Sequence, residues 1–363
     1  MIYCIQYIFG KKRSGLDNEK LRFGILGCGL AARFHAAAIR SIPGAETVGV
    51  FDGDAERARA FCEEFGGSVY ESAEAFFASP EIDAVCVCTP SGYHAENAIA
   101  ALRGGKHVLI EKPVATDLAS AKAILDEARG SGRTVGVVAQ LRPCGAVQRI
   151  RKALEEEQLG RIVSVQLEML YHRSEEYYKC SAWHGTRAVD GGGALINQGI
   201  HGIDLLLYLL GRVKNVTALT RTLYHHIETE DTAAALLEYE NGAIGTIGAA
   251  TSIYPGSPRR LKICGTKGTI TLTEDHITKY YIEGKGSLIG EKEQSDYLSH
   301  NDPGAIPADA HIGVIRDFCA AVREGRSPIS DLTDGYNALA LIRAIYDSAE
   351  RGERVEPEYI DMS

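Results

Sequence analysis

Hydrophobic positions along the chain follow two different patterns, and the change comes near residue 143. Before it, short apolar runs alternate with segments whose apolar side chains recur every three or four residues. Such alternation of strands and helices is typical of a parallel sheet with right-handed crossovers. We therefore predict an α/β domain over residues 21–143. Its expected strands are 23–26, 46–51, 84–88, 107–110 and 135–139, and its main helices are 31–40, 55–65, 95–103 and 118–130.

Beyond residue 143 the pattern indicates an α+β domain over residues 144–363. A helical period at 148–157, an alternating strand at 161–171 and a polar, aromatic loop at 172–187 come first. A helix at 194–210 follows, and then strand-like runs separated by short turns up to residue 283 predict an open, mostly antiparallel sheet. Two helices, 309–324 and 331–351, complete the chain. We assign substrate binding and oligomerisation to this domain.

The first strand runs into a glycine-rich turn that leads directly into a helix. Glycines at 27 and 29 allow a tight turn and a close approach of a ligand, and Ala32 keeps the helix near the strand. The amide groups at the start of the helix then face a pyrophosphate. We predict a Rossmann dinucleotide site here. Its candidate residues are Gly27, Cys28, Gly29, Leu30 and Ala31.

Asp52 ends the second strand, about 25 residues after Gly27, near the distance at which an acidic residue meets the adenosine ribose. A carboxylate there accepts hydrogen bonds from ribose hydroxyls and repels a 2′-phosphate, which favours NAD over NADP. The alternative is that Asp52 only caps the helix 55–65. Asp54 competes for the ribose role, and Arg57 could tolerate a phosphate.

Polar residues follow other strands of the same sheet. Thr89, Lys112 and Gln140 each stand at a carboxyl end, where ligands of open α/β sheets bind, so we expect them around one crevice. Lys112 precedes Pro113, which favours an extended backbone, and an ammonium at an apolar rim has a lowered pKa that suits proton exchange with a hydroxyl. The alternative is an ordinary surface lysine.

A second group of polar residues lies on the helix 194–210. Asn197, His201 and Asp204 have i, i+4 and i+7 spacing, so they share one face, and a histidine with such neighbours can act as a general base. The alternative is a buried histidine with a structural role. Glycines at 191–193 favour the functional interpretation, because they would let a ligand approach the helix N-terminus.

Composition bears on the partners, metal content and location that we expect for the protein. The net charge of −9 gives no reason to expect nucleic-acid binding. Nine scattered cysteines without a CxxC pair read as buried small side chains rather than a metal site, so we expect no metal and a reducing, cytoplasmic location. Residues 1–9 are mostly apolar, but nine residues are too few to span a bilayer, so we expect residues 1–20 to be a poorly ordered extension and expect no membrane partner.

Three stretches together resemble the Gfo/Idh/MocA family of glucose–fructose oxidoreductase and inositol dehydrogenase. They are Gly27-Cys28-Gly29-Leu30-Ala31-Ala32, Glu111-Lys112-Pro113, and the segment ending Gly199-Ile200-His201-Gly202-Ile203-Asp204. The resemblance covers about residues 21–352 and includes the segment from Thr89 and Pro90 to His94, which it places at the cofactor with Gln140. It implies NAD(P)-dependent oxidation or reduction of a sugar, sugar nucleotide or polyol.

Carried over, the resemblance makes Lys112 the residue that hydrogen-bonds the reacting hydroxyl and His201 the general base. Glu111 and Pro113 would hold Lys112 and the nicotinamide ribose. Many members have aspartate where this chain has Asn197, and an amide can orient a hydroxyl but cannot take its proton. The Asn-Gln-x-Ile-His form resembles the branch that contains UDP-N-acetylglucosaminuronate 3-dehydrogenase.

The loop 172–187 is the candidate for substrate specificity. Tyr178 and Trp183 could stack on a sugar face, and Arg173 could bind a carboxylate or phosphate. The alternative is that the aromatic side chains pack the domain junction. Asp309 and His311, at the start of a C-terminal helix, could also reach the site.

The sequence thus predicts an NAD-dependent dehydrogenase of a sugar, sugar nucleotide or polyol. We expect a homodimer or homotetramer, because an open sheet leaves one face without helices. Two alternatives stay open: an NAD-dependent glycosidase that works by transient oxidation, and a non-catalytic NAD-binding regulator.

Overall fold

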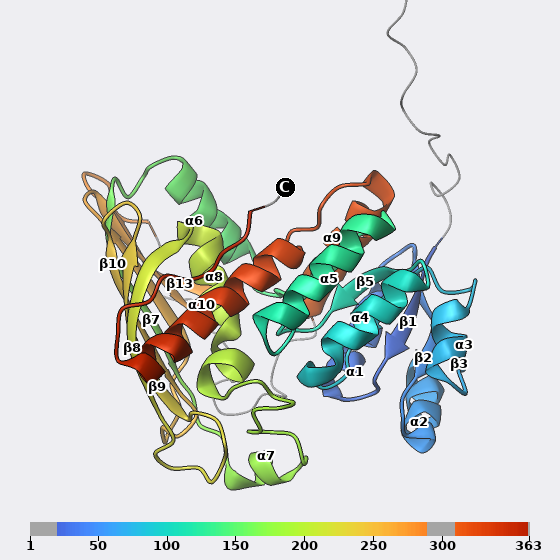
Figure 1. Ribbon diagram of the computed structural model, residues 1–363. Coiled ribbons are helices and arrows are strands. Elements are labelled where there is room, and N and C mark those ends of the chain that lie inside the picture. Colours follow the sequence, from blue (N-terminus) through green and yellow to red (C-terminus); the bar gives the residue numbers. More distant parts are fainter. Residues whose placement is uncertain (1–19, 289–308, 362–363) are drawn as a thin grey trace, which may run out of the picture.

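The computed structural model describes residues 20–288 and 309–361. Almost all of the N-terminal extension predicted over residues 1–20 therefore lies outside the described residues. Two sheets lie at opposite sides of the molecule, and helices fill the space between them (Figure 1). None of the helices in the described ranges combines the length and the apolar character needed to cross a membrane.

The first sheet is parallel throughout its six strands, in the order β3-β2-β1-β4-β5-β6. This confirms the predicted Rossmann-like domain. The short strand β3 escaped the sequence analysis because two exposed residues carry no periodic signal. The strands are β1 Leu21–Leu26, β2 Ala45–Phe51, β3 Ser68–Val69, β4 Ala84–Val87, β5 His107–Ile110 and β6 Val135–Val137.

Helices cover both faces of this sheet. Asp54 and Asp117 start two of them, because each carboxylate accepts backbone N–H groups that have no partner within the helix. The helices are α1 Leu30–Ser41, α2 Ala55–Phe65, α3 Ala73–Ala78, α4 His94–Arg103 and α5 Leu118–Ser131, with a 3₁₀ turn at Ser91–Tyr93.

The second sheet has eight strands in the order β14-β13-β12-β11-β7-β10-β9-β8. Its neighbours are antiparallel except for β7 and β10, as the prediction of an open, mostly antiparallel sheet requires. Buried and exposed residues alternate along most strands, so one face packs inward. The strands are β7 Ile162–Leu170, β8 Val213–Arg221, β9 Thr232–Tyr239, β10 Ile244–Ala250, β11 Arg260–Gly265, β12 Gly268–Thr273, β13 His276–Ile282 and β14 Gly286–Ser287.

The helices of the second half connect the two sheets. The helix α10 packs on β8 and α8 and also reaches α5 and β6, so it runs between the domains (Figure 1). Although α9 follows the second sheet in sequence, it packs against α1, where Val314, Ile315 and Phe318 complete the core of the first domain. These helices are α6 Gly145–Glu155, α7 Glu175–Lys179, α8 Ile200–Leu210, α9 Asp309–Glu324 and α10 Leu332–Arg351.

A buried ion pair fastens this junction. Arg142, just after the first sheet, donates to Asp204 of α8 at 2.7 Å, and its side chain is 3% exposed. The same guanidinium contacts Asp334 at the start of α10 at 2.8 Å. One cation therefore holds two carboxylates from separate helices in place.

We predict that Arg142→Met destabilises the protein by about 3–5 kcal/mol, because the substitution leaves Asp204 buried without its counter-charge. Urea unfolding measures this change. The double variant Arg142→Met/Asp204→Asn should recover part of the loss. Arg351→Met, which removes an exposed i,i+4 partner of Asp347, should change stability by less than about 0.5 kcal/mol. Equal losses at Arg142 and Arg351 would contradict the proposed role of burial.

Candidate active site

The glycine-rich turn has the form that a dinucleotide needs. Gly27 has φ +85°, and a Cβ there would lie 2.8 Å from the carbonyl oxygen of Cys88, so only glycine fits. A Cβ on Gly29 would meet open space, and Gly29 begins α1 without any side-chain cap. The first amides of α1 are thus left to a ligand, and Leu30 beside them is exposed.

Asp52 lies next to this turn. Its carboxylate accepts the Cys28 N–H at 2.7 Å and the Asp54 N–H at 2.8 Å. Capping of α2 falls to Asp54, which accepts the amides of Glu56 and Arg57. The alternative in which Asp52 itself caps this helix is therefore wrong, and its remaining lone pairs can accept ribose hydroxyls.

Lys112 follows β5 and reaches the second domain. Its ammonium donates to the backbone carbonyl of Asn197 at 2.9 Å, and the Lys112–Pro113 peptide is cis. His94 lies behind it, with one ring nitrogen 2.6 Å from the Pro113 carbonyl oxygen and the other 2.8 Å from that of Thr89. His94 is 1% exposed and connects the ends of two strands through these carbonyls, and its contact with the cofactor stays a prediction.

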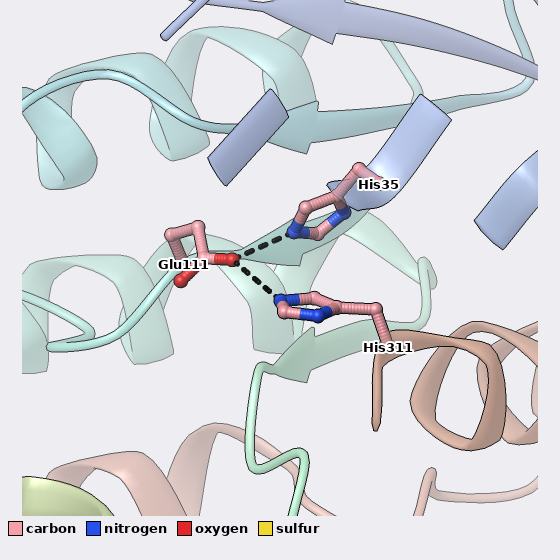
Figure 2. Close-up of side chains that lie close together, drawn as sticks. All are labelled: His35, Glu111 and His311. Carbon is pink, nitrogen blue, oxygen red and sulfur yellow. Dashed lines mark hydrogen bonds and ion pairs between the residues drawn. The ribbon is translucent and has the colours of Figure 1, made fainter. Parts of the chain in front are cut away.

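Glu111 is held from two sides. Figure 2 shows its carboxylate between His35 of α1 and His311 of α9, at 2.7 Å and 3.6 Å from their Nε2 atoms. Burial by itself raises the pKa of Glu111, but the two imidazoles outweigh it and hold that pKa well below its usual range. The other oxygen accepts the Lys112 N–H at 3.2 Å. Glu111 thus joins His35, His311 and the Lys112 amide, and its contact with the nicotinamide ribose stays a prediction.

This cluster is also where three potential metal ligands come within 4.8 Å of one another among the described residues. Ligand atoms of a tetrahedral zinc ion would lie about 3.3 Å apart, given bonds of about 2.0–2.1 Å. The 2.7 Å between His35 and Glu111 is instead a hydrogen-bond distance. The cluster as it stands is a hydrogen-bonded network.

The helix that carries Asn197 and His201 begins with a π turn. Residues Ala194–Gly199 form this turn and α8 continues from it to Leu210, so the predicted helix over 194–210 is confirmed, with π geometry in its first six residues. A π turn has i→i+5 hydrogen bonds, so it holds one more residue per hydrogen-bonded loop than an α-helix. Side chains before the turn are therefore rotated relative to those after it. Asn197 and His201 therefore do not keep ideal i, i+4 spacing.

The glycines before this turn serve packing. A Cβ on Gly193 would lie 1.9 Å from the Glu230 carbonyl oxygen, and Gly193 donates its N–H to the Glu230 carboxylate at 3.0 Å. Leu195 donates to the same carboxylate at 2.8 Å. The helix N-terminus is closed by a buried protein carboxylate. The expectation that these glycines admit a ligand is therefore wrong, because the close approach is made by the protein itself.

His201 faces the junction between the domains. It lines a small cavity with Lys112 and residues 137–139, and the Gln140 amide lies 3.4 Å from its Nε2. Asp204 turns to Arg142 instead, so the expected carboxylate partner of His201 is wrong. Burial, and then the charge of Lys112, hold the pKa of His201 well below its usual range. The imidazole is neutral near pH 7 and can accept a proton.

Lys112 supplies the positive charge at the cavity that His201 also lines. Burial lowers the pKa of its ammonium, and the charges of Glu111 and Asp190 oppose that fall. A cation and a neutral imidazole at one cavity can polarise a hydroxyl and accept its proton.

The loop 172–187 is organised around its own aromatic side chains. Tyr177 stacks on His184 with ring centroids 4.5 Å apart, and Trp183 packs on the same imidazole at 4.1 Å. The Tyr178 hydroxyl donates to Thr251 at 2.8 Å. Part of this loop is the helix α7, which was not predicted. Tyr178 and Trp183 therefore contact neighbours in the second domain, and their role in substrate specificity stays a prediction.

Arg173 is placed differently from the expectation. It is 3% exposed, and it donates to the His172 carbonyl at 2.8 Å and to Gln198 Oε1 at 2.7 Å. Gln198 in turn donates to Asn197 Oδ1 at 3.2 Å. Arg173 thus supports the turn that carries Asn197, and its contact with a substrate stays a prediction.

Three residues that build the site were not predicted from the sequence: His35, Asp190 and Glu230. Each is a buried polar residue whose partners come from distant segments, and such partners leave no local pattern. The one available signal was Asp190, which stands immediately before the three glycines.

The residues present fit a dinucleotide. The open turn at Gly29 fits a pyrophosphate, Asp52 fits the adenosine ribose, and the strand ends at Thr89 and Lys112 lie toward the junction where His201 stands.

Comparison with known proteins points to the same cofactor. Residues 21–139 match the model of an oxidoreductase family with an NAD-binding Rossmann fold, and residues 147–271 match the GFO/IDH/MocA C-terminal domain. D-glucoside 3-dehydrogenase of Escherichia coli (strain K12) is 28% identical, with 95% of this chain and 99% of the relative covered. For 1,5-anhydro-D-fructose reductase of Ensifer adhaerens the identity is 26%, with coverages of 93% and 98%.

Among solved structures, the WlbA dehydrogenase from Bordetella pertussis, in complex with NADH and UDP-GlcNAcA, has a TM-score of 0.83 and 31% identity, over 95% of this chain and 99% of that one. Both domains and the whole length are thus shared with one group of enzymes, and the chain belongs to the Gfo/Idh/MocA family of NAD-binding oxidoreductases.

Proposed function

We propose that this protein oxidises a secondary hydroxyl of a sugar or sugar nucleotide, with Lys112 and His201 as the catalytic residues. The observation that carries the proposal is their meeting at one cavity, although they come from different domains. His201 accepts the hydroxyl proton, and the Lys112 ammonium stabilises the developing alkoxide. NAD supplies the hydride acceptor when it is bound.

Asn197 holds the substrate hydroxyl in this proposal. Its amide cannot take a proton, so His201 carries the base function alone. A UDP-linked sugar acid is the first substrate to test, because the WlbA dehydrogenase was crystallised with UDP-GlcNAcA. Glucosides come next, because the Escherichia coli relative is a D-glucoside 3-dehydrogenase.

The test is NADH absorbance at 340 nm over a panel of UDP-sugars, glucosides and polyols. Formation of stoichiometric NADH supports the dehydrogenase. Cleavage of an aryl glycoside with catalytic NAD and no net NADH would favour the glycosidase alternative instead.

We also propose a homo-oligomer and a cytoplasmic location. Leu219 of β8, Leu236 of β9 and Ile244 of β10 are 60%, 62% and 65% exposed on the outer part of the second sheet. Apolar side chains on adjoining strands of an uncovered sheet are typical of a surface that binds a second copy. All eight cysteines within the described ranges are free, which suits a reducing compartment.

For catalysis, we predict that Lys112→Met and His201→Gln each lower kcat by about 10²–10⁴-fold, because each removes a group that acts on the reacting hydroxyl. NADH binding, followed by fluorescence, should stay within about threefold of the wild type. His226→Gln is the matched control, since His226 is exposed and should leave kcat unchanged. Full activity in either variant would refute the assignment.

For cofactor choice, we predict that Asp52→Asn raises the ratio of NADP to NAD efficiency by about tenfold or more, which corresponds to about 1.4 kcal/mol. The carboxylate that repels a 2′-phosphate is gone, and Arg57, 3.8 Å away, is released toward it. Steady-state kinetics with both cofactors measure the ratio. Glu63→Gln, which removes an exposed carboxylate of α2 away from this site, is the control and should leave the preference unaltered.

For assembly, we predict a dimer or tetramer by light scattering at micromolar concentration, and a shift toward monomer in Leu236→Glu. The new charge would be buried without a partner in the interface. Val69→Glu, at the edge of the first sheet, is the control and should not change the mass. A monomeric wild type would overturn this proposal.

A further inference from the structure

Asp190 is a buried acid that the proposed mechanism does not use. It is 2% exposed and lies just before the glycines that lead into the π turn. One carboxylate oxygen accepts the Asn197 side-chain N–H at 2.5 Å, and the other accepts the Gly185 N–H at 2.8 Å. Both of these donors are neutral, so neither cancels the charge of the carboxylate.

Asn197 connects Asp190 to Lys112. Its side-chain amide binds Asp190, and its backbone carbonyl accepts the Lys112 ammonium at 2.9 Å. One residue thus brings an acid and a base from different domains to the same turn. The Asn197 Oδ1 is bound by Gln198, so the amide orientation is fixed at both ends.

The ionisable groups around Lys112 leave few sources of negative charge. Facing it are Glu111, Asp190, Arg173, His94, His184, His201 and His311. Glu111 has the larger effect on Lys112, but it also binds His35 and His311. The donors to Asp190 described above are amides and not imidazoles, so they do not offset its negative charge. Asp190 is therefore the second carboxylate that balances the ammonium.

The titration of Asp190 is consistent with this role. Burial raises its pKa to about 6, although hydrogen bonds from Gly185 and Asn197 and the charge of Lys112 pull the other way. The charge of Glu230 adds to the rise, and Tyr177 and Tyr178 also face Asp190. Above pH 6 the group is mostly a carboxylate, and below it the charge is lost.

We propose that Asp190 is a positioning residue of the active site: its buried carboxylate fixes the Asn197 amide and supplies negative charge to the Lys112 ammonium. In this chain the carboxylate of Asp190 thus reaches the site through its hydrogen bond with the Asn197 side chain. The inference rests on the proposed function only for its catalytic consequence, since the pairing with Lys112 can be measured without turnover.

The direct test measures the ionisation of Lys112. Trace acetylation of the NAD-free full-length protein with acetic anhydride, across pH 6–11, gives the pH midpoint of Lys112 labelling from the mass of its peptide. Asp190→Asn should move this midpoint to lower pH by about one unit, because an opposite charge near a lysine raises its pKa and the variant removes that charge. Glu228→Gln, an exposed carboxylate beside the same loop, should not move it.

A reciprocal exchange separates charge from packing. The double variant Asp190→Asn/Asn197→Asp keeps one acid and one amide at the 2.5 Å contact and restores negative charge near Lys112. Its labelling midpoint should return to within about 0.3 pH units of the wild type, less than a third of the single-variant shift. If Asp190→Asn alone fails to fold, the labelling midpoint of Lys112 in the double variant is the measurement that tests the proposal. An unchanged midpoint in Asp190→Asn, or in its absence a midpoint in the double variant displaced by a full unit, overturns the proposal.

Kinetics then test the consequence. If the protein oxidises a sugar, the high-pH limb of kcat/KM should shift downward in Asp190→Asn by the same amount as the labelling midpoint, because activity needs the ammonium. A labelling shift without activity in any protein, wild type included, would leave the role of Asp190 standing and refute the proposed function. Loss of activity with no shift of either midpoint would mean that Asp190 only packs the loop.

Discussion

The site depends on one hydrogen bond across the domain junction, from the Lys112 ammonium to the backbone carbonyl of Asn197. Lys112 comes from the end of a parallel strand, and Asn197 from a turn of the second domain. A partly dehydrated ammonium is costly unless oxygens surround it, so the two domains must meet at a fixed distance. The buried pair of Arg142 and Asp204, one turn after His201 on α8, ties that helix to the end of the first domain and so helps to fix the distance.

The helix N-termini of the two domains are used in opposite ways. The first amides of α1 have no side-chain cap and lie beside the open space at Gly29, so they suit a phosphate. The amides of Gly193 and Leu195 are taken by the Glu230 carboxylate. The same backbone amides are thus open to a ligand in one domain, and in the other they fix the turn that carries Asn197. The Glu111 carboxylate likewise joins two helices, because it contacts His35 of α1 and His311 of α9 (Figure 2).

Much of the fold followed from local patterns. Apolar runs of period 2 or 3.6 report burial on one face, so they placed most strands and helices and the change of architecture near residue 143. Gly27 could be predicted because a tight turn excludes other residues. Lys112 could be predicted because it follows a buried strand and precedes Pro113. The elements that escaped prediction were short: β3, β14 and α7, together with the π geometry at Ala194–Gly199. Their bonds depend on distant groups such as Glu230.

By itself, the sequence determined the two kinds of sheet, the dinucleotide turn and the residues that could carry the chemistry. Tertiary structure alone decided which of them meet. It turned Asp204 to Arg142 and Arg173 to Gln198, and it brought Asp190 to Asn197. It also placed α9 on the first domain. Charge pairing in a buried site is set by the three-dimensional distance between groups, and separation along the chain does not encode that distance.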